Sequence, residues 1–329
     1  GAKEKLNRLI NKYRKMLRYV SGGMNVSEVR FGLADLLLTR DDPGDWKEAK
    51  THYDYVLEKA AYGYLRSAAM IGKAELAVRS DDKKELDQAI DYAKRGFNVL
   101  LSLVGKSDFY SIKSLVVEAE LLLKRNGPGD EKEALKLFEK ALKDEMADPY
   151  FRARAIVNKE ERILYSGKFD INKEIHLCHS AIELLKERPN DYFAVKARLL
   201  QGEFIGKRLA RYDKSRATGI FMGVIGTKEA DPDLQARARL DLAEISETKK
   251  AKGLIKEVLS AKNVDSYLVE KAKRLRKELL KAFLFAIRLR LIRLIFILWM
   301  NCLAAKFLWN AGLKRRLKLA LRWKLFTAP

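Results

Sequence analysis

Apolar residues recur every three or four positions through most of the chain, in stretches that short polar turns separate. The first stretch covers residues 3–20, where Leu6, Ile10, Tyr13 and Leu17 share one stripe of a predicted helix. Lysines and arginines cover much of the remaining surface of that helix. Alternating β-branched runs, which are typical of strands, are scarce. The pattern predicts an all-α chain that begins with a basic amphipathic helix.

From about residue 25 to 262 the predicted helices recur as pairs. Six second helices start near Ala49, Ala89, Ala134, Glu174, Ala217 and Ala251, with steps of 40, 45, 40, 43 and 34 residues. Three prolines, each expected to open a new helix, lie eight residues after an apolar residue: Pro149 after Ala141, Pro189 after Ala181 and Pro232 after Val224. Self-similarity at about 40 residues indicates a helical solenoid, a fold that more often binds than catalyses.

Three of the turns inside the pairs place an aspartate three residues before a glutamate, at the start of an apolar-periodic run. The aspartates are Asp45, Asp82 and Asp130. We expect capping boxes here, in which the aspartate accepts from an amide of the first turn and the glutamate reaches back to the cap amide. Two of these turns follow Pro-Gly, which marks the first and third repeats as siblings.

These features resemble the tetratricopeptide-repeat (TPR) superfamily over roughly residues 25 to 265. Its pattern has a small residue midway along the first helix, then Ala, a large apolar residue and Ala on the second. The small position is matched by Ala34, Gly72, Ala119, Gly202 and Ala243, and the second helix by Ala134, Phe138 and Ala141. The resemblance implies a right-handed α-α superhelix, a TPR-like solenoid whose concave groove binds a protein partner. Most repeats here are longer than those of the family.

We therefore expect four segments along the chain. An N-terminal capping helix covers residues 1–23, about six TPR-like pairs cover 24–264, a capping or connecting helix covers 265–293, and an apolar, basic tail covers 294–329.

Alignment of the first helices on their small residue reveals a column of charges. A cation stands six residues earlier in five repeats, at Arg66, Lys113, Arg154, Lys196 and Arg237. An acid stands one residue later, at Asp35, Glu120, Glu161, Glu203 and Glu244, with Lys73 as the exception. Seven residues make two helical turns, so the cation and the acid share a face. The resemblance implies that this face lines the groove. Either the charges form an ion-pair ladder between repeats that binds nothing, or they hold an extended or helical peptide that carries both charges.

The positive charge is concentrated at the C-terminal end. Of the net charge of +22, 15 units lie from Lys271 onward, where 16 Lys/Arg accompany one acid. The same region holds a charge-free run of 12 residues, Leu294–Ala305, and only Lys306 interrupts the apolar stretch to Leu313. Tails of this kind bind membranes or polyanions.

Three geometries remain open for this tail: a membrane span, an in-plane or re-entrant helix, and an interface with protein. The membrane interpretation assigns contacts to Arg293, Trp299, Lys306, Trp309, Lys314, Arg315 and Arg316. The excess of upstream cations then places the repeats at the cytoplasmic face of a membrane.

Nothing in the sequence indicates a catalytic site or a cofactor. No phosphate-binding loop, nucleophile elbow or paired-acid signature stands out. His176, Cys178 and His179 lie close together, but without a second ligand cluster a packed helix is favoured over a metal site. Two distant cysteines exclude a disulfide framework.

The sequence thus predicts a non-catalytic scaffold or adaptor for protein-protein interaction, tethered to a membrane by its tail. The alternative is an RNA-binding or ribonucleoprotein-assembly protein that uses the tail and the Lys/Arg column to bind phosphates.

Overall fold

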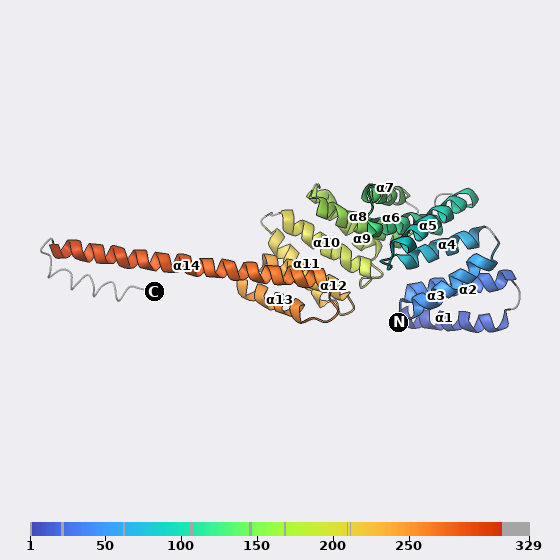
Figure 1. Cartoon of the computed structure of the whole chain (residues 1–329), viewed down its shortest axis with the longest axis horizontal. Coiled ribbons are helices and arrows are strands. Elements are labelled where there is room, and N and C mark those ends of the chain that lie inside the picture. Colours follow the sequence, from blue (N-terminus) through green and yellow to red (C-terminus); the bar gives the residue numbers. More distant parts are fainter. Residues whose placement is uncertain are drawn as a thin grey trace. The chain divides into compact units, whose positions relative to one another are not determined.

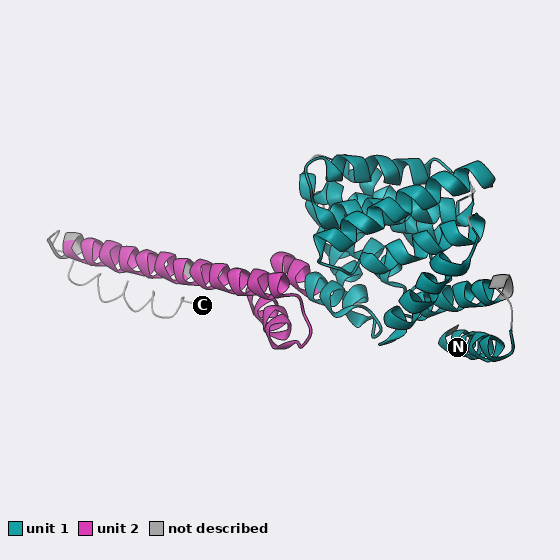
Figure 2. Cartoon of the chain, turned by 45° about the vertical axis from the view of Figure 1, so that its right-hand side comes forward, with its two compact units in different colours: residues 1–238 teal, residues 239–329 magenta. Residues whose placement is uncertain are grey.

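The described part of the chain consists of helices joined by short turns (Figure 1). The computed structural model describes residues 2–20, 23–61, 63–104, 108–144, 147–167, 169–208, 210 and 212–310, and over these residues it has fourteen helices and no strand. The chain divides into two compact units, residues 1–238 and residues 239–329 (Figure 2). The all-α prediction is confirmed.

The first unit is a single helix followed by a stack of helix hairpins. The helices are α1 (Ala2–Tyr19), α2 (Gly23–Arg40), α3 (Asp45–Lys59), α4 (Tyr64–Ala77), α5 (Lys83–Leu103), α6 (Phe109–Arg125), α7 (Asp130–Leu142), α8 (Pro149–Ser166), α9 (Ile171–Leu184), α10 (Tyr192–Arg208) and α11 (Asp213–Gly226). The division between the units falls inside α12 (Pro232–Ile245). The even-numbered helices from α2 are the first helices of the predicted pairs, and the odd-numbered ones from α3 are the second. The hairpins therefore follow the predicted order.

Several first helices begin at an aspartate whose side chain accepts from an amide of the first turn. Asp108 caps α6 and Asp148 caps α8 in this way. Pro149 and Pro232 are the first residues of α8 and α12, as predicted. Pro189 does not open a helix, because α10 begins only at Tyr192.

The predicted capping boxes are correct in only one of three turns, and there only in part. Asp82 caps α5 by accepting from the amide of Lys84, but its own amide donates to Ser80. In α3 and α7 the cap is a glycine with positive φ, Gly44 and Gly129. The aspartates that follow, Asp45 and Asp130, are buried and bind arginines.

This inward arrangement recurs in every second hairpin as an Arg–Asp clasp. The arginine that ends the first helix donates Nε and Nη2 to both oxygens of the aspartate that starts the second, at 2.5 to 2.8 Å. The same carboxylate accepts a backbone amide three residues before it. The clasps are Arg40 with Asp45, Arg125 with Asp130 and Arg208 with Asp213. The intervening hairpins begin their second helices at the capping residues Asp82 and Asp170 instead.

The core of the first unit lies along the predicted small positions. Ala34 and Ala119 are fully buried, as are the large side chains of Tyr53 and Phe138 on the second helices. Gly72 lies against the Tyr53 ring so closely that an added Cβ would stand 2.3 Å from it. The small residue is therefore required by the close approach of α4 and α3.

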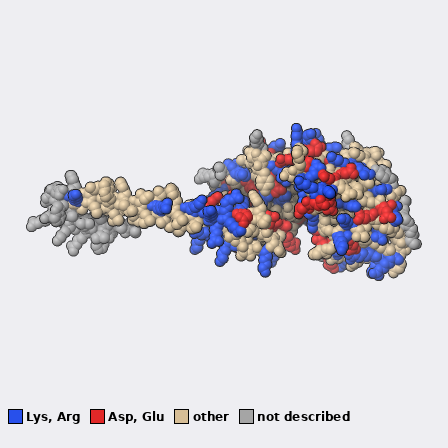
Figure 3. Space-filling model, in the orientation of Figure 1, with Lys and Arg blue, Asp and Glu red and all other residues tan. Residues whose placement is uncertain are grey.

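The second unit contains the end of α12, then α13 (Thr248–Ser260) and α14 (Ser266–Asn310). α14 is one uninterrupted helix of 45 residues, so no break marks the predicted division at 293. Leu268 and Ala272 are buried, but the large apolar side chains from Leu280 to Leu303 are exposed. Figure 3 shows the C-terminal half of the described part of α14 as a mainly uncharged surface with a few basic side chains.

Within the residues described, no helix is both long enough and apolar enough to cross a membrane. Trp299 is 57% exposed on α14. Lys314, Arg315, Arg316 and the side chain of Trp309 lie outside the described residues.

Candidate partner-binding groove

A groove of about 1240 Å³ runs along the first helices of the first unit. Residues from α2, α4, α6, α8 and α10 line it, together with the turns before α10 and α12. Charged groups of both signs and six aromatic rings face it. It therefore spans five consecutive hairpins.

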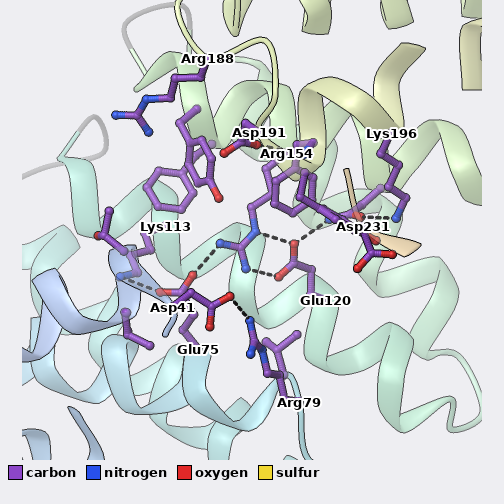
Figure 4. Close-up of a pocket in the computed structure, with 18 of the residues that line it drawn as sticks. Asp41, Glu75, Arg79, Lys113, Glu120, Arg154, Arg188, Asp191, Lys196 and Asp231 are labelled. Atoms are coloured by element: carbon purple, nitrogen blue, oxygen red, sulfur yellow. Dashed lines mark hydrogen bonds and ion pairs between the residues drawn. The ribbon is translucent and has the colours of Figure 1, made fainter. Parts of the chain in front are cut away.

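Figure 4 shows part of the predicted charge column among the side chains that line this groove, with Arg154 bound to Glu120 and also to Glu75, which the column did not include. Arg154 donates from Nε to Glu120 at 2.7 Å and from Nη1 to Glu75 at 2.6 Å. The carboxylates belong to the two preceding first helices. One arginine thus links three hairpins.

The same geometry recurs farther along the array. Arg237 donates to Glu203 and to Glu161, each at 2.6 Å. Lysines occupy the intervening places: Lys113 lies 2.8 Å from Glu75, and Lys196 lies 2.8 Å from Glu161. Arginine and lysine therefore alternate from one hairpin to the next. We call this set of ion pairs the charge ladder.

Asn158 makes the charge ladder continuous. Its amide nitrogen donates to Glu120 at 2.6 Å, and its oxygen accepts from Lys196 at 3.4 Å. At the N-terminal end, Asp35 lies 3.8 Å from Lys113 and accepts the hydroxyls of Tyr53 and Tyr110. The network reaches from Asp35 on α2 to Arg237 on α12 and so includes residues of six hairpins.

Burial makes the charges of the ladder depend on each other. Burial alone lowers the pKa of Arg154, but Glu120 and Glu75 raise it well above its usual value. Burial raises the pKa of Glu75, but Lys113 and Arg154 outweigh it and lower the value to about 2. Arg154 and Glu75 therefore both stay ionised near neutral pH. Because such charges must be paired inside a protein, the ladder acts first as internal structure.

Not all predicted groove residues line the groove. Lys113, Glu120, Arg154, Glu161 and Lys196 do. Glu203 and Arg237 continue the charge ladder beyond the lining residues, and Arg66 is not among the residues that line it. Glu244 belongs to the second unit, where it lies 3.1 Å from Lys271. The binding of a partner by these side chains stays a prediction.

An aromatic row along the groove was missed in the sequence. A pair of aromatic residues stands at the start of three first helices: Phe109 and Tyr110, Tyr150 and Phe151, Tyr192 and Phe193. Rings of successive helices meet edge to face, with centroids 5.2 Å apart for Phe109 and Phe151 and 5.9 Å for Tyr150 and Phe193. The signal was present, because each pair stands three and four residues before a cation of the ladder.

The cations of the ladder also lie against this aromatic row. The guanidinium of Arg154 is 5.9 Å from the Phe151 ring and 5.4 Å from the Phe193 ring, and Lys196 is 5.6 Å from Tyr192. Tyr192 is 44% exposed. The rings therefore both shield the ladder and offer accessible apolar surface in the groove.

The helix that carries the two histidines packs through its cysteine. Cys178 is buried in the core between α8, α9 and α10, and its thiol is free. Among the residues described, no group of three His, Cys, Asp or Glu side chains is placed to hold a metal ion.

No protein-family model matches the chain, and no curated protein matches it. Among solved structures, the chain is similar to a Signal Transduction ATPase with Numerous Domains (STAND) protein with a tetratricopeptide repeat sensor from Pyrococcus horikoshii. The identity is 14% and the TM-score 0.53, and the match covers 87% of this chain and 47% of that chain. A match to BtubC from P. vanneervenii has 14% identity, covers 84% of this chain and 90% of that chain, and has a TM-score of 0.30.

The similarity to the STAND protein shows the fold alone. This chain spans about half the length of that protein. Together with the stacked hairpins, the match confirms an all-α solenoid with helical repeats. The TM-score of the BtubC match is too low to bear on the fold.

Proposed function

We propose that this chain is a non-catalytic adaptor that binds a protein partner in its groove and is held at the cytoplasmic face of a membrane by its C-terminal segment. The observation that carries the proposal is the groove itself, a cavity of about 1240 Å³ with aromatic and charged side chains from five hairpins. A surface of this length suits an extended or helical peptide better than a small molecule.

The geometry changes which side chains are expected to bind the partner. Among the cations of the charge ladder, Lys113, Arg154 and Lys196 are buried and Arg237 is partly buried, and each already holds two carboxylates or a carboxylate and an amide. Tyr192 and Arg188 are exposed at the groove. We therefore assign the principal partner contacts to the aromatic row and the outer charges, with the ladder as their support.

The matched test replaces one exposed tyrosine inside the groove and one outside it. Tyr192→Ala removes a ring that lines the groove, whereas Tyr19→Ala removes a ring of α1 that is 85% exposed and not among the lining residues. Proximity labelling in cells from the full chain is expected to lose a defined set of proteins with Tyr192→Ala and to keep it with Tyr19→Ala. Identical labelling by both variants and the unaltered chain would exclude the groove as the binding surface.

The exposed apolar surface of α14 supports the membrane part of the proposal. Phe285, Ile295 and Leu298 are each more than 60% exposed, and apolar side chains surround the helix rather than forming one stripe. Such a surface is normally covered by lipid or by protein. The basic residues before it favour an anionic surface.

Vesicle flotation with full-length variants tests the tether. Leu294→Glu with Leu298→Glu is expected to abolish flotation with anionic vesicles. Leu103→Glu with Val104→Glu changes two other exposed apolar residues, which lie at the end of α5, and is expected to float normally. An RNA shift that weakens steeply with salt, without flotation of the unaltered chain, would instead support the RNA-binding alternative.

A further inference from the structure

The fourth hairpin, α8 with α9, differs from the others at its two small positions. In the other five hairpins these positions pair Ala34 with Ala49, Gly72 with Ala89, Ala119 with Ala134, Gly202 with Ala217 and Ala243 with Ala251. All ten small residues are buried. The fourth hairpin instead has Glu160 on α8 and Glu174 on α9.

A compensating change in size accompanies these two acids. In the fifth hairpin the Phe221 ring fills the space against Gly202, where an added Cβ would stand 2.8 Å from the ring. The equivalent of Phe221 in the fourth hairpin is Cys178, four residues after Glu174. The small Cys178 thiol therefore leaves room for the larger side chains of Glu160 and Glu174, so the core of this hairpin holds both acids in place of two small residues.

Both glutamates are buried, and three of their four carboxylate oxygens have no hydrogen-bond donor among the described residues. Glu160 is 0% exposed and Glu174 is 4% exposed. Among the residues described, neither side-chain oxygen of Glu160 has a hydrogen-bond partner, and the same holds for Oε2 of Glu174. Two ionised carboxylates in this state would be strongly unfavourable. One proton between them would supply the missing donor.

The surrounding charged groups do not neutralise the pair. Lys159 of α8 and Lys173 of α9 lower the pKa of Glu160 only weakly. Lys159 also lies 3.6 Å from Glu139 of α7. On α10, Glu203 is held by Arg237. Burial, and then the neighbouring Glu174 carboxyl, raise the pKa of Glu160 to about 9. Burial likewise raises the pKa of the Cys178 thiol, which leaves it neutral beside the acids.

We propose that Glu160 and Glu174 share one proton in the folded array, and that loss of this proton loosens the α8–α9 hairpin. The hairpin is then a pH-dependent joint in the middle of the first unit. Since α8 also carries Arg154, Asn158 and Glu161, the joint lies directly behind the centre of the groove.

The sign of the pH dependence follows from the bound proton. Between the ordinary pKa of a glutamate and about 9, the folded state holds a proton that the unfolded state has released. Stability is therefore highest at low pH within this range and falls as pH rises. The variant Glu160→Gln keeps a donor permanently in place and removes this dependence.

Denaturant unfolding of the full chain at pH 5 to 9 tests the proposal. The folding equilibrium constant of Glu160→Gln, divided by that of the unaltered chain, is expected to rise about tenfold for each pH unit. Glu174→Gln should behave similarly. Glu183→Gln, an exposed acid on the same helix, should leave the ratio constant. A constant ratio for Glu160→Gln as well would overturn the proposal.

Hydrogen exchange locates the effect within the structure. After correction for intrinsic rates, amides of α8 and α9 in the unaltered chain are expected to lose protection between pH 6 and 9, more than those of α6 and α7. In Glu160→Gln this difference should disappear. Uniform behaviour of all four helices in the unaltered chain would contradict a local joint. This readout separates the joint from partner binding, because no partner is present.

A reconstruction of the fifth hairpin's pattern provides a further check. The variant Glu160→Gly, Glu174→Ala, Cys178→Phe carries the residues found at the equivalent places in α10 and α11. Its folding stability is expected not to show the fall with rising pH that the two acids cause in the unaltered chain. If the variant folds and its stability still falls as pH rises, the two acids do not cause that pH dependence. If it does not fold, the comparison of Glu160→Gln with Glu183→Gln still decides.

Discussion

At the scale of single residues, the array depends on close approaches that the sequence shows only as small side chains. Gly72 faces the ring of Tyr53, whose hydroxyl donates to Asp35 at 2.5 Å. The glycine thus allows a buried tyrosine to reach the first acid of the charge ladder. The repeat pattern predicts only that residue 72 is small, but in the structure a residue without a Cβ is needed here for the hydrogen bond between Tyr53 and Asp35 to form.

Gly72→Ala is expected to lower the free energy of unfolding by about 1 to 3 kcal/mol, because the Tyr53 ring must move and weaken its bond to Asp35. Denaturant unfolding of the full chain measures this. Gly219→Ala is the control, since Gly219 is an exposed helical glycine of α11 with nothing within 4 Å of an added Cβ. It should stabilise by up to about 1 kcal/mol. Equal effects of the two variants would refute the packing argument.

Arg154→Met is expected to cost about 3 to 5 kcal/mol, because it leaves Glu75 and Glu120 partly buried without their shared cation. It should also reduce the acid dependence of stability. The pKa of Glu75, lowered to about 2, contributes stability that is present above its ordinary value and is lost as pH falls through about 2. Unfolding at pH 7 and pH 3 measures both effects. Arg188→Met, an exposed cation of the groove, serves as the control; a loss as large as that of Arg154→Met would show that burial does not set the cost.

At the scale of elements, the sequence predicted the hairpins well and their turns less well. Apolar periodicity depends on burial, so the order of helices and the small positions were predictable. The turns were not, because Asp45 and Asp82 stand in the same local pattern but make different bonds. The deciding partner of Asp45 is Arg40, five residues earlier, and only the turn geometry brings the two together. A pattern restricted to the second helix does not contain that information.

The candidate site divides in the same way. Most cations and acids of the charge ladder were found because they repeat, but Glu75 was missed because it lies two residues beyond the repeated position, which Lys73 occupies. Their pairing partners could not be assigned, because Arg154 reaches Glu75, 79 residues away, across an intervening hairpin. The aromatic pairs, such as Tyr150 with Phe151, were overlooked although they recur at a fixed offset from the cations. Glu160 was missed as a site because it interrupts the small-residue pattern.

A double-mutant cycle of Arg125→Ala and Asp130→Ala tests the clasp. We expect a coupling energy of about 1.5 to 3 kcal/mol, because two charge-assisted hydrogen bonds join the helices across the turn. The exposed pair Arg95 and Asp91, within one helix at 3.3 Å, should couple by less than about 1 kcal/mol. Similar coupling in the two cycles would mean that the clasp adds nothing beyond an ordinary surface ion pair.

At the scale of the whole molecule, buried ion pairs and exposed apolar surface are concentrated in different units. The first unit buries part of its charge in the ladder and the clasps, where cations are bound to carboxylates. The second unit exposes a long helix with basic and apolar side chains together. The strong positive charge of the chain therefore describes α14 and the residues after it better than it describes the repeats.

Limited trypsin digestion is expected to cut first in the exposed part of α14, after Lys281, Arg288, Arg290 or Arg293. The cleaved chain should retain residues of the first unit as a resistant product, because the arginines of the clasps and the ladder are bound to carboxylates. Mass spectrometry of the early products identifies the sites. Cleavage in the hairpins before α14 would contradict this division, and protection of α14 by anionic vesicles would add support for the tether.

The alternation of hairpin types has a consequence for how such a chain can change in length. Clasps recur at Arg40, Arg125 and Arg208, and arginines of the ladder recur at Arg154 and Arg237, 83 residues apart. Excising one hairpin would bring two lysines, or two arginines, into neighbouring places and leave an acid facing the wrong cation. Excising two adjacent hairpins would restore the original neighbours. The natural module for shortening, extending or grafting this scaffold is thus a block of four helices.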